Sequence, residues 1–97
     1  MPYFYNKNNR ITLSGYISQI RTEEKYIEID LIVSRPVSVK GAKTYTDNIC
    51  VYVSPFDLRN FVINNLKNGS VINVKGELRS WADGSYKVCA GEIVLKG

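Results

Sequence analysis

The chain has 97 residues, a formal net charge of +4, 44% hydrophobic residues and 23% charged residues. This length allows one domain with a single modest core, and the composition excludes wholesale disorder. No apolar run approaches the roughly 20 residues that span a bilayer. The N-terminus also lacks the continuous apolar core of a signal peptide, so we expect no membrane association and a cytoplasmic location. The positive charge is compatible with a polyanionic partner.

Residue types that commonly carry catalysis or bind metals are scarce. Histidine, the commonest general base and metal ligand, is absent. Cys50 and Cys89 lie far apart in predicted strands instead of forming the close pairs of zinc sites. We expect buried or half-buried free thiols, with a disulfide or a redox role as the alternatives. No phosphate-binding loop, nucleophile elbow or carboxylate-rich metal site takes the place of histidine, so we predict no enzymatic activity, no metal and no cofactor.

Residues 1–8 are predicted to form an aromatic arm that precedes a domain over residues 9–97. The arm contains Tyr3, Phe4 and Tyr5 and then turns polar. Its rings either cover a nearby apolar patch, pack on a partner or second subunit, or stack on bases.

Alternating apolar and polar residues predict two strands, Asn9 to Ile20 and Tyr26 to Ser34, joined by a short polar turn. Gly15 lies in the middle of the first strand and permits a sharp coil or a bulge there. The side chains expected on the inner face are Ile11, Leu13, Ile17, Ile27, Ile29, Leu31 and Val33.

Residues 35–47 predict a loop, because Pro36 and Gly41 interrupt the alternating pattern there. The loop is cationic and carries an aromatic ring, through Arg35, Lys40, Lys43 and Tyr45. It is either simply solvated or a clamp on a sugar-phosphate backbone. A third strand, Asn48 to Val53, follows, with Cys50 and Tyr52 on its polar side.

A short helix is predicted after the third strand. Ser54 is suited to cap its first turn, Pro55 to occupy its first position, and Asp57 to complement its dipole. One apolar face repeats at three- and four-residue spacing, and Asn68-Gly69 supplies a left-handed stop. The residues of that face are Leu58, Phe61, Val62 and Leu66.

Two further strands complete the chain, joined by a hairpin at residues 82–85. In the fourth strand Ile72, Val74 and Leu78 are expected to face inward, and the run ends at Trp81. The fifth strand runs from Tyr86 to Leu95, and its apolar residues change phase, which predicts a bulge near Gly91.

Three strands, a helix and two strands in about a hundred residues are the order of the OB fold. We therefore predict an all-β, five-stranded OB-fold Greek-key barrel with one α-helix between strands three and four. A five-stranded SH3-like barrel is the structural competitor, but it lacks a real helix at that point.

The chain resembles the bacterial single-stranded DNA-binding protein family and its relative, the primosomal replication protein of the PriB type. The resemblance extends over about Asn9 to Leu95. Its motifs are the asparagine, leucine and glycine of the first strand, the glycine amid valines of the fourth, and the tryptophan, aspartate and glycine of the last hairpin. They lie at Asn9 to Gly15, at Lys67 to Arg79, and at Trp81 to Gly84 followed by Tyr86 and Glu92 to Val94.

The chain also departs from that family. The first hairpin is shorter, the third strand has no tryptophan, and Glu28 and Asp30 place negative charge on the outer face of the second strand, which in this family lies near the DNA path. The sequence ends at Gly97 without the glycine-rich linker and acidic tip of the bacterial housekeeping protein. We expect any protein partner to be held by the barrel or the arm.

The resemblance implies a single-stranded DNA-binding replication accessory that uses rings for bases and cations for phosphates, with little sequence preference. The expected base-stacking residues are Trp81, Tyr52, Tyr86, Tyr45 and Tyr16. The expected phosphate contacts are Arg35, Lys40, Lys43, Lys75, Arg79 and Lys87. For Trp81, the alternative is a place in the core, and for each cation it is a solvated surface.

The resemblance also implies a homo-oligomer that pairs through the first strand, a dimer in preference to a tetramer. One alternative function is a small interaction subunit that docks onto a primase, polymerase or helicase of a phage or mobile element. Another is an RNA-binding barrel.

Overall fold

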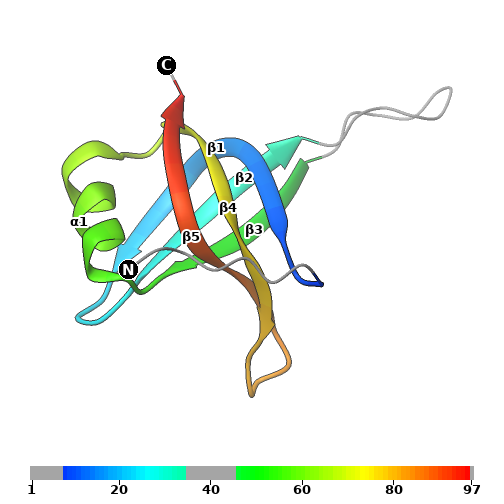
Figure 1. Ribbon diagram of the computed structural model, residues 1–97. Helices are drawn as coiled ribbons and strands as arrows, with labels where there is room; N and C mark the ends of the chain where they lie inside the picture. The colour runs from blue at the N-terminus through cyan, green and yellow to red at the C-terminus, as the bar shows by residue number, and fades with distance from the viewer. Residues whose placement is uncertain (1–7, 35–45, 97) are drawn as a thin grey trace, which may run out of the picture.

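A computed structural model describes residues 8–34 and 46–96, which form a closed β-barrel with one helix (Figure 1). The elements are β1 (Ile11–Thr22), β2 (Ile27–Ser34), β3 (Thr46–Val53), α1 (Phe56–Asn65), β4 (Val71–Ser80) and β5 (Tyr86–Lys96). The neighbour order is β1-β2-β3-β5-β4, and β1 pairs with β4 to close the barrel. Only the β3–β5 pair is parallel among these neighbours. The predicted five-stranded OB barrel, with its helix between the third and fourth strands, is confirmed.

The barrel interior is filled by the inward side chains of the strands. Ile27, Ile29 and Leu31 of β2 are fully buried, as their alternation predicts. The helix lies beside the barrel (Figure 1), and its Val62 joins this core. Leu66, just past the helix, is also buried. The remaining buried apolar residues are Ile17, Val51, Val53, Ile72, Val74, Val88, Ala90 and Ile93. The described helix is too short and too polar to cross a membrane.

The long strand β1 serves two neighbours. Residues Ile11 to Tyr16 pair with β4, and residues Tyr16 to Thr22 pair with β2. The irregularity in the β1–β2 register lies between Ile17 and Gln19 and not at Gly15, where a bend was predicted. Gly15 is instead a point of close approach, because a Cβ atom there would lie 2.2 Å from the carbonyl oxygen of Ile32.

The predicted helix cap at Ser54 is wrong. The N-cap is Pro55, which is extended and has no side-chain donor or acceptor, so no side chain caps this end. The carbonyl oxygen of Ser54 accepts a hydrogen bond from Nε of Arg59 at 3.0 Å, and the carbonyl of Pro55 accepts the Arg59 amide at 2.9 Å. Asp57 lies in the first turn, as predicted.

The helix also ends earlier than predicted, at Asn65. Leu66 is extended and buried, so the chain leaves the helix four residues before Gly69. Gly69 does have a positive φ of 92°, but it serves the turn into β4. Its amide donates to the carbonyl of Ile17 at 2.7 Å, which ties this turn to β1.

The β4–β5 hairpin carries the predicted bulge at Gly91. Lys75 is opposite Glu92 and Gly76 is opposite Ala90, so Gly91 has no partner in the register. Leu78 was predicted to face the core, but 40% of its surface is exposed. The pairing of β4 with β1 stops at Gly76, so the hairpin continues past the closed part of the barrel and Leu78 has no β1 side chain to cover it.

The close approach at Gly15 gives a stability test. We expect Gly15→Ala to lower the free energy of unfolding by about 1–3 kcal/mol, because the added methyl group would collide with the Ile32 backbone. Thr12→Ala, an exposed site on the same strand, should change it by no more than about 0.5 kcal/mol. Urea unfolding measures both variants, and equal losses would contradict the proposed steric cause.

Candidate nucleic-acid interface

One row of outward side chains crosses all five strands. Glu77 of β4 is opposite Cys89 of β5, and Cys89 is opposite Tyr52 of β3. Tyr52 is in turn opposite Glu28 of β2, which is opposite Arg21 of β1. These residues share the outer surface because each pair of strands is aligned at this level. The row therefore places the ring of Tyr52 between the thiol of Cys89 and the charged groups of β2 and β1.

Three aromatic rings lie together on this surface, and we call Tyr26, Tyr52 and Trp81 the aromatic cluster. The rings of Tyr26 and Tyr52 are stacked, with centroids 5.1 Å apart and an angle of 30° between their planes. The ring of Tyr52 meets that of Trp81 edge to face at 5.2 Å and 67°. All three are half-buried, so neither Trp81 nor Tyr52 belongs to the core.

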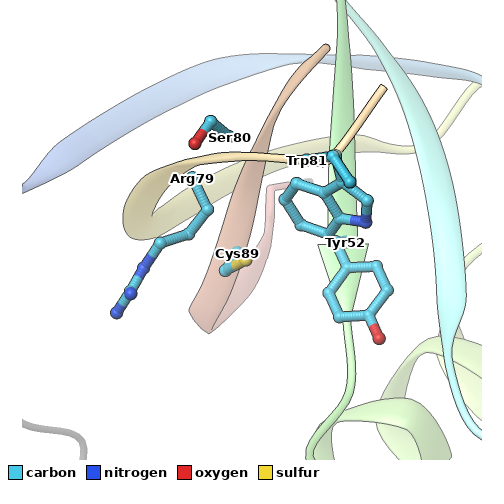
Figure 2. Close-up of a pocket in the computed structure, with 6 residues that line it drawn as sticks. Tyr52, Arg79, Ser80, Trp81 and Cys89 are labelled. Atoms are coloured by element: carbon cyan, nitrogen blue, oxygen red, sulfur yellow. The ribbon is translucent and has the colours of Figure 1, made fainter. Parts of the chain in front are cut away.

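An open hollow of about 510 Å³ lies against the cluster, and we call it the aromatic hollow (Figure 2). Its lining comprises Tyr52, Arg79, Ser80, Trp81, Ala82 and Cys89. Figure 2 shows the rings of Trp81 and Tyr52 beside each other, with Arg79 projecting away from them. Arg79 is the one cation among the described residues of the lining, and its Nη2 lies 3.2 Å from a carboxylate oxygen of Glu77.

The hairpin between β4 and β5 fixes the position of Trp81. Its amide donates to the carbonyl of Ser85 at 2.8 Å, and its own carbonyl accepts the Gly84 amide at 2.9 Å. Oδ1 of Asp83 accepts from both the amide and the hydroxyl of Ser85. These bonds lower the pKa of Asp83, and Gly84 supplies the positive φ of 88° that the turn requires.

An ion-pair network of Arg21, Glu28, Asp30 and Lys87 lies next to the cluster. The Arg21 guanidinium binds both carboxylate oxygens of Asp30, at 2.6 and 2.9 Å. Lys87 bonds to Glu28, and its Nζ also lies 4.9 Å from the centroid of the Trp81 ring. The hydrogen bond from Arg21 lowers the pKa of Asp30, and the one from Lys87 lowers the pKa of Glu28. The acidic face of β2 is thus neutralised by its neighbours.

Both cysteines are free and half-buried, which confirms the expectation from their spacing. Burial, with the nearby Glu28 carboxylate, raises the pKa of Cys50 to about 11, and burial also raises the pKa of Cys89. Their thiols are therefore protonated and weakly reactive at neutral pH. Within residues 8–34 and 46–96, no group of three or more cysteine, aspartate or glutamate side chains is placed to hold a metal ion.

Of the predicted stacking residues that the structure describes, Trp81 and Tyr52 are the two in contact. Tyr86 is exposed at the start of β5, opposite Ser80, and does not line the aromatic hollow. Tyr16 is opposite Val71, at the far end of β4 from Trp81, which is roughly 30 Å along an extended strand. Tyr45 lies outside the described residues.

Each predicted phosphate contact in the described chain has a carboxylate partner. Lys75 pairs with Glu92 at 3.6 Å, while Arg79 and Lys87 have the partners given above. The predicted contacts Arg35, Lys40 and Lys43 lie outside the described residues, as do Tyr3, Phe4 and Tyr5 of the arm.

Tyr26 is the member of the cluster that sequence reasoning missed. It immediately precedes β2 and is two residues from Glu28, so alternation places it on the same outer face. Because β2 pairs with β3, that face also carries Tyr52. The alternation of β2 and a correct β2–β3 register together would have found it.

Three solved structures have the same fold. The N-terminal domain of PriB from Thermoanaerobacter tencongensis, described as dimeric, is 24% identical with a TM-score of 0.70, over 94% of this chain and 99% of that one. The Plasmodium falciparum SSB in complex with ssDNA is 16% identical with a TM-score of 0.76, over 98% and 100%. A small single-stranded DNA-binding protein from Mycoplasma pneumoniae is 18% identical with a TM-score of 0.71, over 89% and 91%.

No protein-family model matches the chain, and no curated protein matches it. The structural matches define it as an OB-fold barrel of the kind found in single-stranded DNA-binding proteins. The barrel has, in particular, the fold of PriB and of the small bacterial SSB proteins, as the sequence motifs indicated.

The contribution of the Arg21–Asp30 ion pair to the stability of the fold should depend on pH. Because folding lowers the pKa of Asp30, its ionised form stabilises the protein above the pKa of the unfolded chain, and this contribution is lost as pH falls through the lower folded value. We expect Asp30→Asn to unfold at lower urea than wild type at pH 7 and the difference to close towards pH 3. Glu23→Gln, an exposed carboxylate in the adjacent turn, should show no such closing difference. A difference for Asp30→Asn that stays constant with pH would contradict the assignment.

Proposed function

We propose that the protein binds single-stranded DNA and acts as an accessory in DNA replication. The observation that carries this proposal is the aromatic cluster beside an open hollow, on a barrel whose fold is that of single-stranded DNA-binding proteins. In OB folds generally, the face of strands two and three and the two adjoining hairpin loops bind oligonucleotides. The cluster combines residues of that face with the β4–β5 hairpin. We also propose a non-enzymatic protein located in the cytoplasm.

The proposed mechanism is stacking of unpaired bases on the rings, with phosphates bound by cations at the edge of the hollow. The accessible parts of the half-buried Tyr52 and Trp81 rings offer apolar area that any base can cover, so sequence preference should be small. Arg79 is the proposed phosphate contact at the hollow. Its side chain is 57% exposed and contacts Glu77 through Nη2, so the other N–H groups of the guanidinium can bind a phosphate while this ion pair persists. Lys75 lies four residues earlier on the same face of β4 and extends this path.

The function is tested with fluorescently labelled oligo-dT, oligo-U and a matched duplex, by anisotropy at two salt concentrations. We expect oligo-dT to bind more tightly than the duplex and binding to weaken as salt rises. A stronger signal with oligo-U would favour RNA as the ligand. No binding to any single strand at low salt would overturn the proposal and favour a protein-interaction subunit of a primase, polymerase or helicase.

The aromatic cluster itself is tested by Trp81→Ala. We expect affinity for oligo-dT to fall about tenfold or more, since a stacked ring contributes roughly 1–3 kcal/mol per base. The matched control is Phe56→Ala, which removes a ring that is 67% exposed on α1 and does not line the hollow. The anisotropy titration compares both variants with wild type, and equal affinities for all three would contradict the role of Trp81.

We further propose that the protein is a homodimer that pairs through the outer face of β1, β4 and β5, with a tetramer as the alternative. Tyr16, Val71 and Val94 are exposed apolar side chains on these strands. Tyr16 is opposite Val71, and Val94 is opposite Asn73, two residues along β4 on the same face. The matching PriB domain is described as dimeric and covers nearly the whole chain, which supports a second copy as the occupant of this face.

Light scattering after size exclusion tests the dimer. We expect wild type to show twice the 11.0 kDa chain mass, or four times for a tetramer, and Val94→Glu to show the single mass because a charge would be buried in the interface. Ile63→Glu, an exposed site on α1, should leave the mass unchanged. A wild-type monomer at micromolar concentration would contradict the proposal.

A further inference from the structure

Lys87 differs from Arg79, the cation of the aromatic hollow, in the position of its charged group. Its ammonium lies over the Trp81 ring, 4.9 Å from the centroid, and bonds to Glu28. It does not line the aromatic hollow, whereas Arg79 does. The two cations are opposite each other in the β4–β5 register, so the hairpin presents one to the hollow and keeps the other behind the indole.

The surroundings also make it costly to break the ion pair between Lys87 and Glu28. The Lys87 side chain is 21% exposed, compared with 57% for Arg79, whereas their carboxylate partners Glu28 and Glu77 are similarly exposed, at 16% and 15%. Without Lys87, the half-buried Glu28 carboxylate would keep, among the residues that the structure describes, Arg21 at 3.7 Å and the weak thiol donor of Cys50 at 3.7 Å. A poorly exposed carboxylate that loses its main partner is costly, so a phosphate cannot easily draw Lys87 away. The raised pKa of Lys87 and the lowered pKa of Glu28 agree with this tight pairing.

The indole of Trp81 also depends on neighbouring side chains for its orientation. Trp81 lies just beyond the end of β4, where the closed part of the barrel no longer supports it. Tyr52 meets it edge to face, and the Lys87 ammonium lies over its ring. A cation over an indole is attracted to the ring face, so these two contacts hold the ring in one orientation.

We propose that Lys87 is a positioning residue, which Glu28 holds against the Trp81 ring, and that the phosphate of a bound single strand contacts Arg79 instead. The inference rests on the proposed function and deepens it. Bases enter the aromatic hollow, where Lys87 is not present, and the sugar-phosphate backbone runs on the β4 side. That path keeps phosphates away from the carboxylates of Glu28 and Asp30 on β2.

The dependence of oligo-dT affinity on salt separates the two roles, because each phosphate contact adds about 0.7 to the slope of log K against log salt for single strands. We expect Arg79→Gln to flatten the slope by about 0.7. We expect Lys87→Gln to weaken binding by about two- to tenfold at every salt concentration without changing the slope. Lys87→Arg should restore the affinity, since a guanidinium can pair with Glu28 and lie over the ring.

Glu28→Gln, unlike Lys87→Gln, should change the slope. It releases the ammonium, so the slope should steepen by up to about 0.7, and the double variant Glu28→Gln with Lys87→Gln should lose this gain. Urea unfolding confirms that each variant is folded before titration. If Lys87→Gln flattens the slope as much as Arg79→Gln does, Lys87 is a phosphate contact and the inference is overturned.

A second measurement needs no DNA. Trp81 is the only tryptophan in the chain, so tryptophan emission, excited selectively over that of the tyrosines, reports on this ring. We expect Glu28→Gln to increase quenching by iodide and Lys87→Gln to decrease it, while quenching by neutral acrylamide changes little, because the net charge beside the ring changes in opposite directions. Unchanged iodide quenching in both variants would overturn the placement of Lys87.

If wild type binds no oligo-dT at low salt, the proposed function fails and the positioning role fails with it, whereas a flattened slope for Lys87→Gln overturns this inference alone.

Discussion

The parallel pairing of β3 with β5 is the constraint on which the candidate site depends. It joins two halves of the sheet that are far apart in sequence, through Val51 opposite Val88 and Tyr52 opposite Cys89. With this pairing in place, the β4–β5 hairpin extends past the end of the β1–β4 ladder and carries Trp81 to the ring of Tyr52. The buried residues on the inner side of both strands fix the register, since a slip by one residue would turn Val51 and Val88 outwards. The packing of the core therefore also positions the rings outside it.

Much of the fold followed from the sequence because alternation is a strong local signal. Residues such as Ile29, Val51 and Val74 occupy the inner positions that their spacing predicts, and the phase change in β5 placed the bulge at Gly91. The predictions that were wrong concern features that depend on where neighbouring elements end, and the local sequence pattern does not contain this information. Leu78 follows the alternation but lies beyond the strand that would have covered it, and Ser54 has capping chemistry but lies one residue outside the position that needs it.

The candidate site was less predictable for a related reason. Trp81 and Tyr52 were identified as single exposed rings, but their contact depends on strand order and not on sequence spacing. Tyr26 was missed because its stacking partner lies on another strand. The ion pairs were hidden in the same way: Glu28 and Lys87 are far apart in sequence and meet only across the closed barrel. Composition gives the number of charges, but pairing between strands decides which of them remain available.

This pairing also explains how an acidic strand fits on a surface proposed to bind a polyanion. Unpaired carboxylates at Glu28 and Asp30 would repel phosphates over a Debye length of about 8–10 Å. In the barrel, Arg21 and Lys87 neutralise them at contact distance, beside the rings of Tyr52 and Trp81. Such a site would gain most of its affinity from stacking and a smaller part from phosphate contacts, and this division is compatible with a net charge of only +4.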